Sequence, residues 1–176
     1  MLLRNYETRV ASDATQSNHQ DHGNMQMRAN ISSGSPLEST AGFSRAVRIG
    51  DLLAVAGTAP VALDGSVAAP GDVYGQTKRC LQIIATVLGA AGLGKGDVIR
   101  TRIMLTDIQT WRDAAKTHRE SFARFKPACT FVEVSRFIDP GWLIEVEADC
   151  VFLRNPPAAR DSGGSARLAV SRIPFD

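Results

Sequence analysis

The stretch VIRTRIMLT, residues 98–106, alternates between two kinds of side chain. Because successive side chains of a strand point to opposite faces of a sheet, this alternation predicts a β-strand. One face would carry Ile99, Thr101, Ile103 and Leu105, and the other would carry Arg100, Arg102 and Met104. The more apolar face is expected to lie against helices.

The residues that follow predict a helix and a second strand. Asp107 is suited to cap a helix, and Pro127 stands just beyond the expected helix end. The apolar stripe of this helix would consist of Trp111, Ala114, Ala115, His118, Phe122 and Phe125. The alternating run CTFVEVSRF, residues 129–137, is then typical of a strand.

A similar pattern precedes residue 98. SRAVRIGDLLAVAG, residues 44–57, reads as a hairpin that turns at Gly50 and Asp51. Asp72 can cap a helix that ends at Gly92. Its small or apolar residues recur at helical spacing: Thr77, Cys80, Leu81, Ile84, Val87, Leu88 and Ala91.

A last strand, WLIEVEADCVFL at residues 142–153, follows the turn IDPG at 138–141. The predicted class is therefore α+β, with the order β-β-α-β-α-β-β and two helices on one face of the sheet. The residues expected under these helices are Ile99, Ile103, Val132, Val134, Ile144 and Val146. The residues expected on the other face are Arg100, Arg102, Met104, Phe131, Glu133, Leu143, Glu145 and Glu147. That mixture is too apolar to leave in water and too charged for a closed core, so we expect subunits to associate through it.

Composition sets the boundaries and the class of protein. Residues 1–30 and 155–176 are polar or rich in Pro, Ser and Gly, so they are predicted to be flexible extensions of a domain at 31–154. The formal net charge of +2 predicts no nucleic-acid partner, and the sequence has no apolar run long enough to span a membrane. The 3 cysteines form no CxxC pair, which argues against a zinc site or a disulfide framework. We expect a cytoplasmic protein.

Five blocks of this sequence, in order, resemble the RidA (YjgF) family of small enamine/imine deaminases: GFSRAVRIGDLLAVAGTAP, DVYGQTKRCLQIIATVLGAAG, DVIRTRIMLTDI, KPACTFVEV and LIEVEADC. The resemblance spans residues 31–153 and implies a chorismate-mutase-like fold assembled as a homotrimer, with ligand clefts between subunits. It also implies hydrolysis of reactive 2-imino acids to 2-oxo acids and ammonia, with no metal or cofactor.

The resemblance also assigns site residues. Family members carry an arginine that clamps the substrate carboxylate, at the position of Cys129. Phe43-Ser44 replaces a frequent Tyr-Ser pair, Gly57 matches a backbone that lines the cleft, and Glu145 matches the glutamate that holds the attacking water. Arg45, beside Ser44, replaces a common glutamine, and Trp142 is expected to contact the ligand. A thiol cannot supply the two charged hydrogen bonds of a guanidinium, so 2-imino acids should bind weakly.

Each of these residues also has a purely structural interpretation. Cys129 is either a nucleophile or, as we prefer, a small residue lining the cleft, because the predicted faces separate it from His118. His118 itself is more simply explained as a hydrogen-bonded helix residue than as a base or ligand. Glu145 and Glu147 share a face either as catalytic groups or as partners of arginines. Arg45 either restores a positive charge to the cleft or is an ordinary surface arginine.

Three functions are compatible with this pattern. The first is a protein that binds and hydrolyses a small imine or carbonyl compound other than the usual 2-imino acids. The second is a trimer that binds metabolites or stabilises proteins without catalysis. The third, a ribonuclease, ranks last because the chain lacks a basic groove and a histidine pair.

Overall fold

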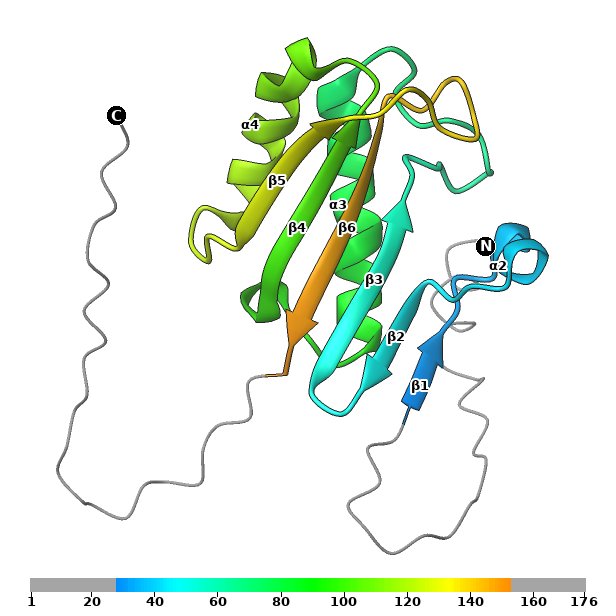
Figure 1. The fold of residues 1–176 in the computed structure, drawn as a ribbon, viewed down its shortest axis with the longest axis vertical. Helices are drawn as coiled ribbons and strands as arrows, with labels where there is room; N and C mark the ends of the chain where they lie inside the picture. Colours follow the sequence, from blue (N-terminus) through cyan, green and yellow to red (C-terminus); the bar gives the residue numbers. More distant parts are fainter. Residues whose placement is uncertain (1–27, 153–176) are drawn as a thin grey trace, which may run out of the picture.

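The computed structural model describes residues 28–152, which form six strands and three helices (Figure 1). The strands are β1 (Arg28–Ile31), β2 (Ala46–Ile49), β3 (Leu52–Thr58), β4 (Val98–Leu105), β5 (Ala128–Glu133) and β6 (Ile144–Val151). The helices are α2 (Pro36–Ala41), α3 (Val73–Ala90) and α4 (Trp111–Phe122), with short 3-10 turns at Lys95–Asp97 and Ile108–Thr110.

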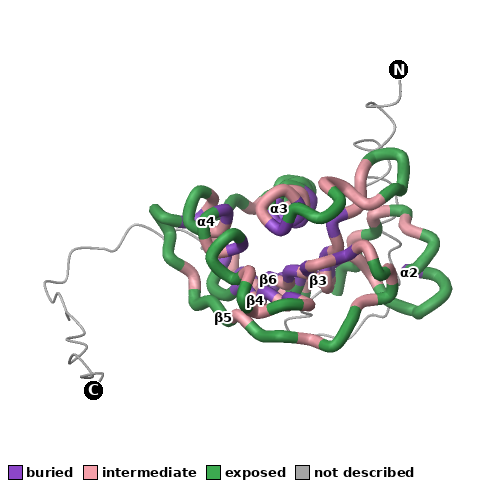
Figure 2. Tube along the Cα trace, turned by 90° about the horizontal axis from the view of Figure 1, so that it is seen from above, coloured by how far each residue is buried: buried purple, intermediate pink, exposed green. Residues whose placement is uncertain are grey.

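All six strands form one sheet in the order β1-β2-β3-β6-β4-β5. Neighbouring strands are antiparallel except β4 and β5, which are parallel because α4 carries the chain back between them. Helices α3 and α4 lie side by side on one face, and the buried residues gather between them and the sheet (Figure 2). The prediction of an α+β fold with two helices on one face of the sheet is confirmed.

The predicted boundaries of α3 and of the hairpin agree closely with the structure, whereas α4 begins at Trp111, and Asp107 caps the 3-10 turn Ile108–Thr110 instead of this helix. Helix α3 begins after Asp72, although the Asp72 side chain makes no capping hydrogen bond, and it ends just before Ala91. Strands β2 and β3 form the expected hairpin. Gly50 in its turn has φ 59°, a left-handed conformation that glycine adopts without a steric penalty.

The covered face contains Ile103, Ile144 and Val146 as predicted, and none of the three has an exposed surface. The prediction for Ile99 is wrong, since this side chain is 49% exposed. The pairing of β4 with β6 shifts by one residue between Val98 and Arg100, which is a β-bulge. The bulge places Val98, 4% exposed, in the core position that the simple alternation assigned to Ile99.

The side chains of β5 point to the opposite faces of the sheet from those predicted. It pairs with β4 so that Cys129 lies beside Thr101 and Phe131 beside Ile103, both of which are buried under the helices. Phe131 accordingly packs against the core and meets the Trp111 ring edge-on at 6.1 Å. Val132, predicted to be covered, is 40% exposed, and β5 ends at Glu133, before Val134. Cys129, Phe131 and Glu133 therefore belong to the helix side of the sheet.

Two elements were not predicted. Strand β1 pairs with β2 and includes residues 28–30 of the stretch predicted to be flexible, so these three residues belong to the sheet. Helix α2 begins at Pro36 after Ser35, whose hydroxyl accepts from the Leu37 amide, and ends at left-handed Gly42. These are ordinary start and stop signals that the prediction overlooked.

The rest of the N-terminal extension, residues 1–27, and the whole predicted C-terminal extension, residues 155–176, lie outside the described residues, as do residues 153 and 154 at the end of the predicted domain. Within the described part, no helix is both long enough and apolar enough to cross a membrane.

Candidate functional site

Glu145 occupies the open face of the sheet near the start of β6. Its neighbours Ile144 and Val146 are fully buried under the helices, so the alternation of the strand directs Glu145 to the other side. Burial raises the pKa of the Glu145 carboxyl, the Arg45 charge opposes this shift, and Glu147 reinforces it. A carboxyl with a raised pKa gives up and takes back a proton nearer to neutral pH than an ordinary glutamate does.

Gly57 in β3 lies directly against Glu145. A Cβ atom added at Gly57 would stand 2.8 Å from Oε2 of Glu145, closer than side-chain carbons approach other atoms. The pairing of β3 with β6 is irregular between Val55 and Thr58, which is the segment that contains Gly57. The irregular backbone and the missing side chain together make room for the carboxylate.

Arg45 joins the same group from the segment before β2. One terminal nitrogen, Nη1, donates to the Gly57 carbonyl at 2.8 Å and to the Thr58 hydroxyl at 3.4 Å. The Phe43 ring centroid lies 5.9 Å from the guanidinium carbon. Nε of Arg45 is buried and has no hydrogen-bond partner among residues 28–152. Phe43, Arg45, Gly57 and Glu145 are called the Glu145 cluster below.

Two other predicted residues lie outside these contacts. Ser44 is half-buried, and Trp142 is 9% exposed just before β6. Within residues 28–152, neither side chain forms a hydrogen bond with the cluster.

Sequence reasoning missed a residue that positions β6. Gln76 of α3 is fully buried, donates to the Gly141 carbonyl at 2.9 Å and accepts from the Leu143 amide at 2.8 Å. These two bonds hold the turn that leads into Glu145. The signal was available, because Gln76 is a polar residue four positions before Cys80 on the apolar stripe of α3, and a buried amide needs partners.

The rest of the open face carries ion pairs within the chain. Arg102 bonds Glu147 through Nη1 and Asp149 through Nη2, each at 3.1 Å. Arg100 reaches Asp149 at 4.0 Å. Glu147 therefore acts as an arginine partner, which is the structural alternative considered for it, whereas no arginine forms a salt bridge with Glu145 in the described residues.

Cys129 is separated from the Glu145 cluster. It lies on the edge strand β5, two strands from β6, and on the helix side of the sheet. There Thr101 bonds Nε2 of His118 at 2.9 Å, and burial lowers the pKa of His118. Burial raises the pKa of the Cys129 thiol, and a hydrogen bond from Thr101 opposes this shift. The argument that separate faces keep Cys129 from His118 is therefore wrong, because both lie beside Thr101.

The cluster has the groups needed for acid–base chemistry on a small molecule. Glu145 can exchange a proton, Arg45 supplies a positive charge, and Phe43 is 37% exposed as an apolar wall. In the described part of the chain, no three His, Cys, Asp or Glu residues gather as metal ligands.

Comparison with known proteins agrees with this fold. The family model described as "Endoribonuclease L-PSP" matches residues 33–152. An uncharacterised protein of Streptomyces coelicolor is 38% identical over 120 residues, which cover 68% of this chain and 88% of that protein.

Two solved structures extend the comparison. A YjgF/YER057c/UK114-family protein of Mycobacterium tuberculosis is 43% identical, with a TM-score of 0.64 over 71% of this chain and 99% of that one. The structure of TdcF from Escherichia coli with bound serine is 26% identical, with a TM-score of 0.57 over 62% and 87% of the two chains. These matches confirm the resemblance and the α+β fold expected from it. The chain belongs to the endoribonuclease L-PSP family, also known as the YjgF/RidA family.

Proposed function

We propose that this protein binds a small reactive imine or carbonyl compound at the Glu145 cluster and hydrolyses it. The family is one of small-molecule-binding proteins. The observation that carries the proposal is the half-buried Glu145 carboxyl with its raised pKa, held against Gly57 and beside the Arg45 charge.

In the proposed reaction, Glu145 takes a proton from a water molecule as the water oxygen attacks the carbon of a C=N bond. The carbon–nitrogen bond then breaks, and the nitrogen leaves as ammonia after taking up protons, so imine and water yield a carbonyl compound and ammonia. Arg45, which donates to the Gly57 carbonyl, fixes the backbone beside the carboxylate.

The cleft is proposed to form between subunits of a trimer. The Glu145 cluster and Cys129 belong to opposite faces of one chain, so a cleft that contains both needs two chains. The exposed open-face side chains, among them Leu52 at 59%, supply apolar surface for such contacts. Ser44 and Trp142 are proposed to line the cleft near the cluster.

The substrate is proposed to lack the carboxylate of 2-imino acids. The arginine that the family resemblance places at position 129 is a cysteine here, and partial burial raises the pKa of its thiol. A neutral thiol cannot pair with a carboxylate.

Ammonia release tests the reaction. We would compare wild type, Glu145→Gln and the matched control Glu147→Gln on 2-iminopropanoate and on imines of simple aldehydes and ketones. Turnover of the carboxylate-free imines should fall by at least a hundredfold in Glu145→Gln and persist in Glu147→Gln. Equal turnover in wild type and Glu145→Gln would refute the assignment.

The substrate class is tested by Cys129→Arg. This variant should gain activity on 2-iminopropanoate if the missing arginine is what limits that substrate. Full wild-type activity on 2-iminopropanoate would contradict the substrate class and make Arg45 the first residue to test as the carboxylate partner.

A second function, binding without catalysis, is favoured by one observation, the same cysteine at position 129. It predicts a raised melting temperature with 2-oxo acids and no ammonia from any imine. The third function, a ribonuclease, would instead be detected as cleavage of RNA. His118, the one histidine in residues 28–152, forms a hydrogen bond with Thr101.

A further inference from the structure

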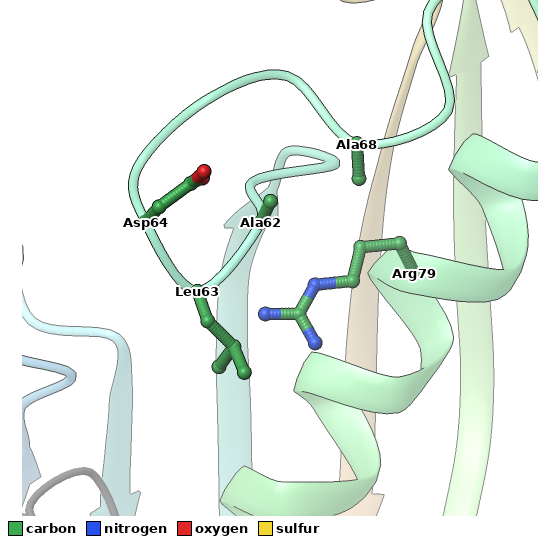
Figure 3. A pocket seen from close by; sticks show the side chains of 5 residues that line it. All are labelled: Ala62, Leu63, Asp64, Ala68 and Arg79. Atoms are coloured by element: carbon green, nitrogen blue, oxygen red, sulfur yellow. The ribbon is translucent and has the colours of Figure 1, made fainter. Parts of the chain in front are cut away.

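A pocket unrelated to the Glu145 cluster lies between α3 and the loop that joins it to β3. It is shallow and widely open to solvent, has a volume of about 410 Å³ and is lined by Ala62, Leu63, Asp64, Ala68 and Arg79 (Figure 3). Its walls are mostly apolar, and Leu63 is 67% exposed at its rim. None of the residues predicted from the sequence lines it.

The loop is held in one shape by its own hydrogen bonds. Ala62 donates to the Ser66 carbonyl and Ala68 to the Pro60 carbonyl, each at 2.8 Å, and Val61 pairs with Val67. Asp64 closes the tip by accepting from the Ser66 amide at 3.0 Å and from its hydroxyl at 2.7 Å. A ligand would therefore meet walls that are already formed, which lowers the entropy cost of binding.

Arg79 gives the pocket its positive charge. Its Nε donates to the Val61 carbonyl at 2.6 Å, which fixes the guanidinium against the loop. In residues 28–152 no acceptor bonds the two terminal nitrogens. Figure 3 shows the guanidinium extending from α3 toward the loop, on the side of Leu63. Two donors in one plane match the two oxygens of a carboxylate.

We propose that this pocket binds a small organic monocarboxylate, with its two oxygens on the terminal nitrogens of Arg79 and its short apolar chain against Ala62, Leu63 and Ala68. One guanidinium balances one negative charge. The Asp64 carboxylate on the same rim disfavours a second negative charge, so a phosphate dianion fits less well.

Amide and arginine NMR signals of the full chain test the proposal, with sodium butyrate as the probe. Butyrate should shift the Arg79 Nε–H signal and the Leu63 amide signal saturably. Neutral butyramide should leave both unchanged at the same concentration. Inorganic phosphate should need at least a tenfold higher concentration. Absence of a saturable butyrate shift, or equal shifts with butyramide or phosphate, would overturn the assignment.

Three variants assign the effect to its residue. Arg79→Gln should weaken butyrate binding at least tenfold, read from the Leu63 amide, and Arg79→Lys should weaken it less because it keeps the charge. Arg112→Gln, which alters an arginine stacked on Trp111 of α4, should bind like wild type. Undiminished binding by a folded Arg79→Gln would refute the proposal. Glu145→Gln should keep the butyrate shift, which separates this pocket from the proposed catalytic site.

Discussion

The two faces of the sheet are built from the same strands by different interactions. On the helix side, Ile103, Ile144 and Val146 are fully buried and belong to one apolar core together with residues of α3 and α4. On the open side, Arg102 pairs with both Glu147 and Asp149, and all three side chains remain partly exposed. Apolar burial contributes far more to folding than such ion pairs do. The open face is therefore free to carry the Glu145 cluster at little cost to the fold.

The strongest test of this contrast is Ile103→Ala. It should lower the free energy of unfolding by about 2–5 kcal/mol, because it leaves a cavity in the core. Ile99→Ala on the same strand is the control, and it should change stability by less than about 0.5 kcal/mol because Ile99 is 49% exposed. Urea denaturation measures both. Equal losses would mean that the bulge at Ile99 is absent.

A smaller loss of stability is expected for Gln76, the residue of α3 that holds the turn leading into Glu145. Gln76→Ala should cost about 1–3 kcal/mol, since it leaves the Gly141 carbonyl and the Leu143 amide unpaired. It should also reduce ammonia release, because the turn before Glu145 loosens. Gln82→Ala, at an exposed position of α3, serves as the control. Unchanged stability would show that these two bonds do not hold the turn.

Glu145→Gln should raise stability modestly at neutral pH. The folded pKa of Glu145 lies above its unfolded value, so ionisation favours the unfolded chain, and native stability falls as pH rises from the unfolded toward the folded pKa. The variant should lose that part of the pH dependence, and its melting temperature should match wild type only in acid. A wild-type advantage at pH 8 would contradict the raised pKa.

The smallest effect is expected for the ion pairs themselves. Arg102→Gln should cost about 0.2–1 kcal/mol, and the difference should shrink in about 1 M salt, because partly exposed pairs are screened. Denaturation at two salt concentrations measures this. A salt-independent loss above about 2 kcal/mol would indicate that Arg102 is desolvated, as it would be inside a subunit interface.

Much of the fold was predictable because local signals agreed with one another. The alternation at residues 98–106, the turn at Gly50 and the stripe of α3 all specified elements that the structure contains. The faces to which the side chains of β5 point were not predictable in the same way. Thr130, Phe131 and Val132 suit either face, and only the pairing of Cys129 with Thr101 decides between them.

The residues of the candidate site could be named from the sequence, but their arrangement in space could not. Arg45, Gly57 and Glu145 were all identified, although they come from three distant segments. Their contact depends on the irregular pairing of β3 with β6, which leaves no pattern in the sequence. Cys129 is separated from these three residues because the side chain of Cys129 points to the helix side of the sheet. The sequence did not predict this, because the residues of β5 suit either face.

The sheet order also has a consequence for synthesis of the chain. Strand β6 lies between β3 and β4, yet it leaves the ribosome after both of them. Until residues 144–151 emerge, β3 and β4 each present an unpaired edge, and the two halves of the sheet have no strand to join them. A nascent chain stalled before residue 144 is therefore open to pairing with other chains, and the emergence of residues 144–151 joins the two halves of the sheet.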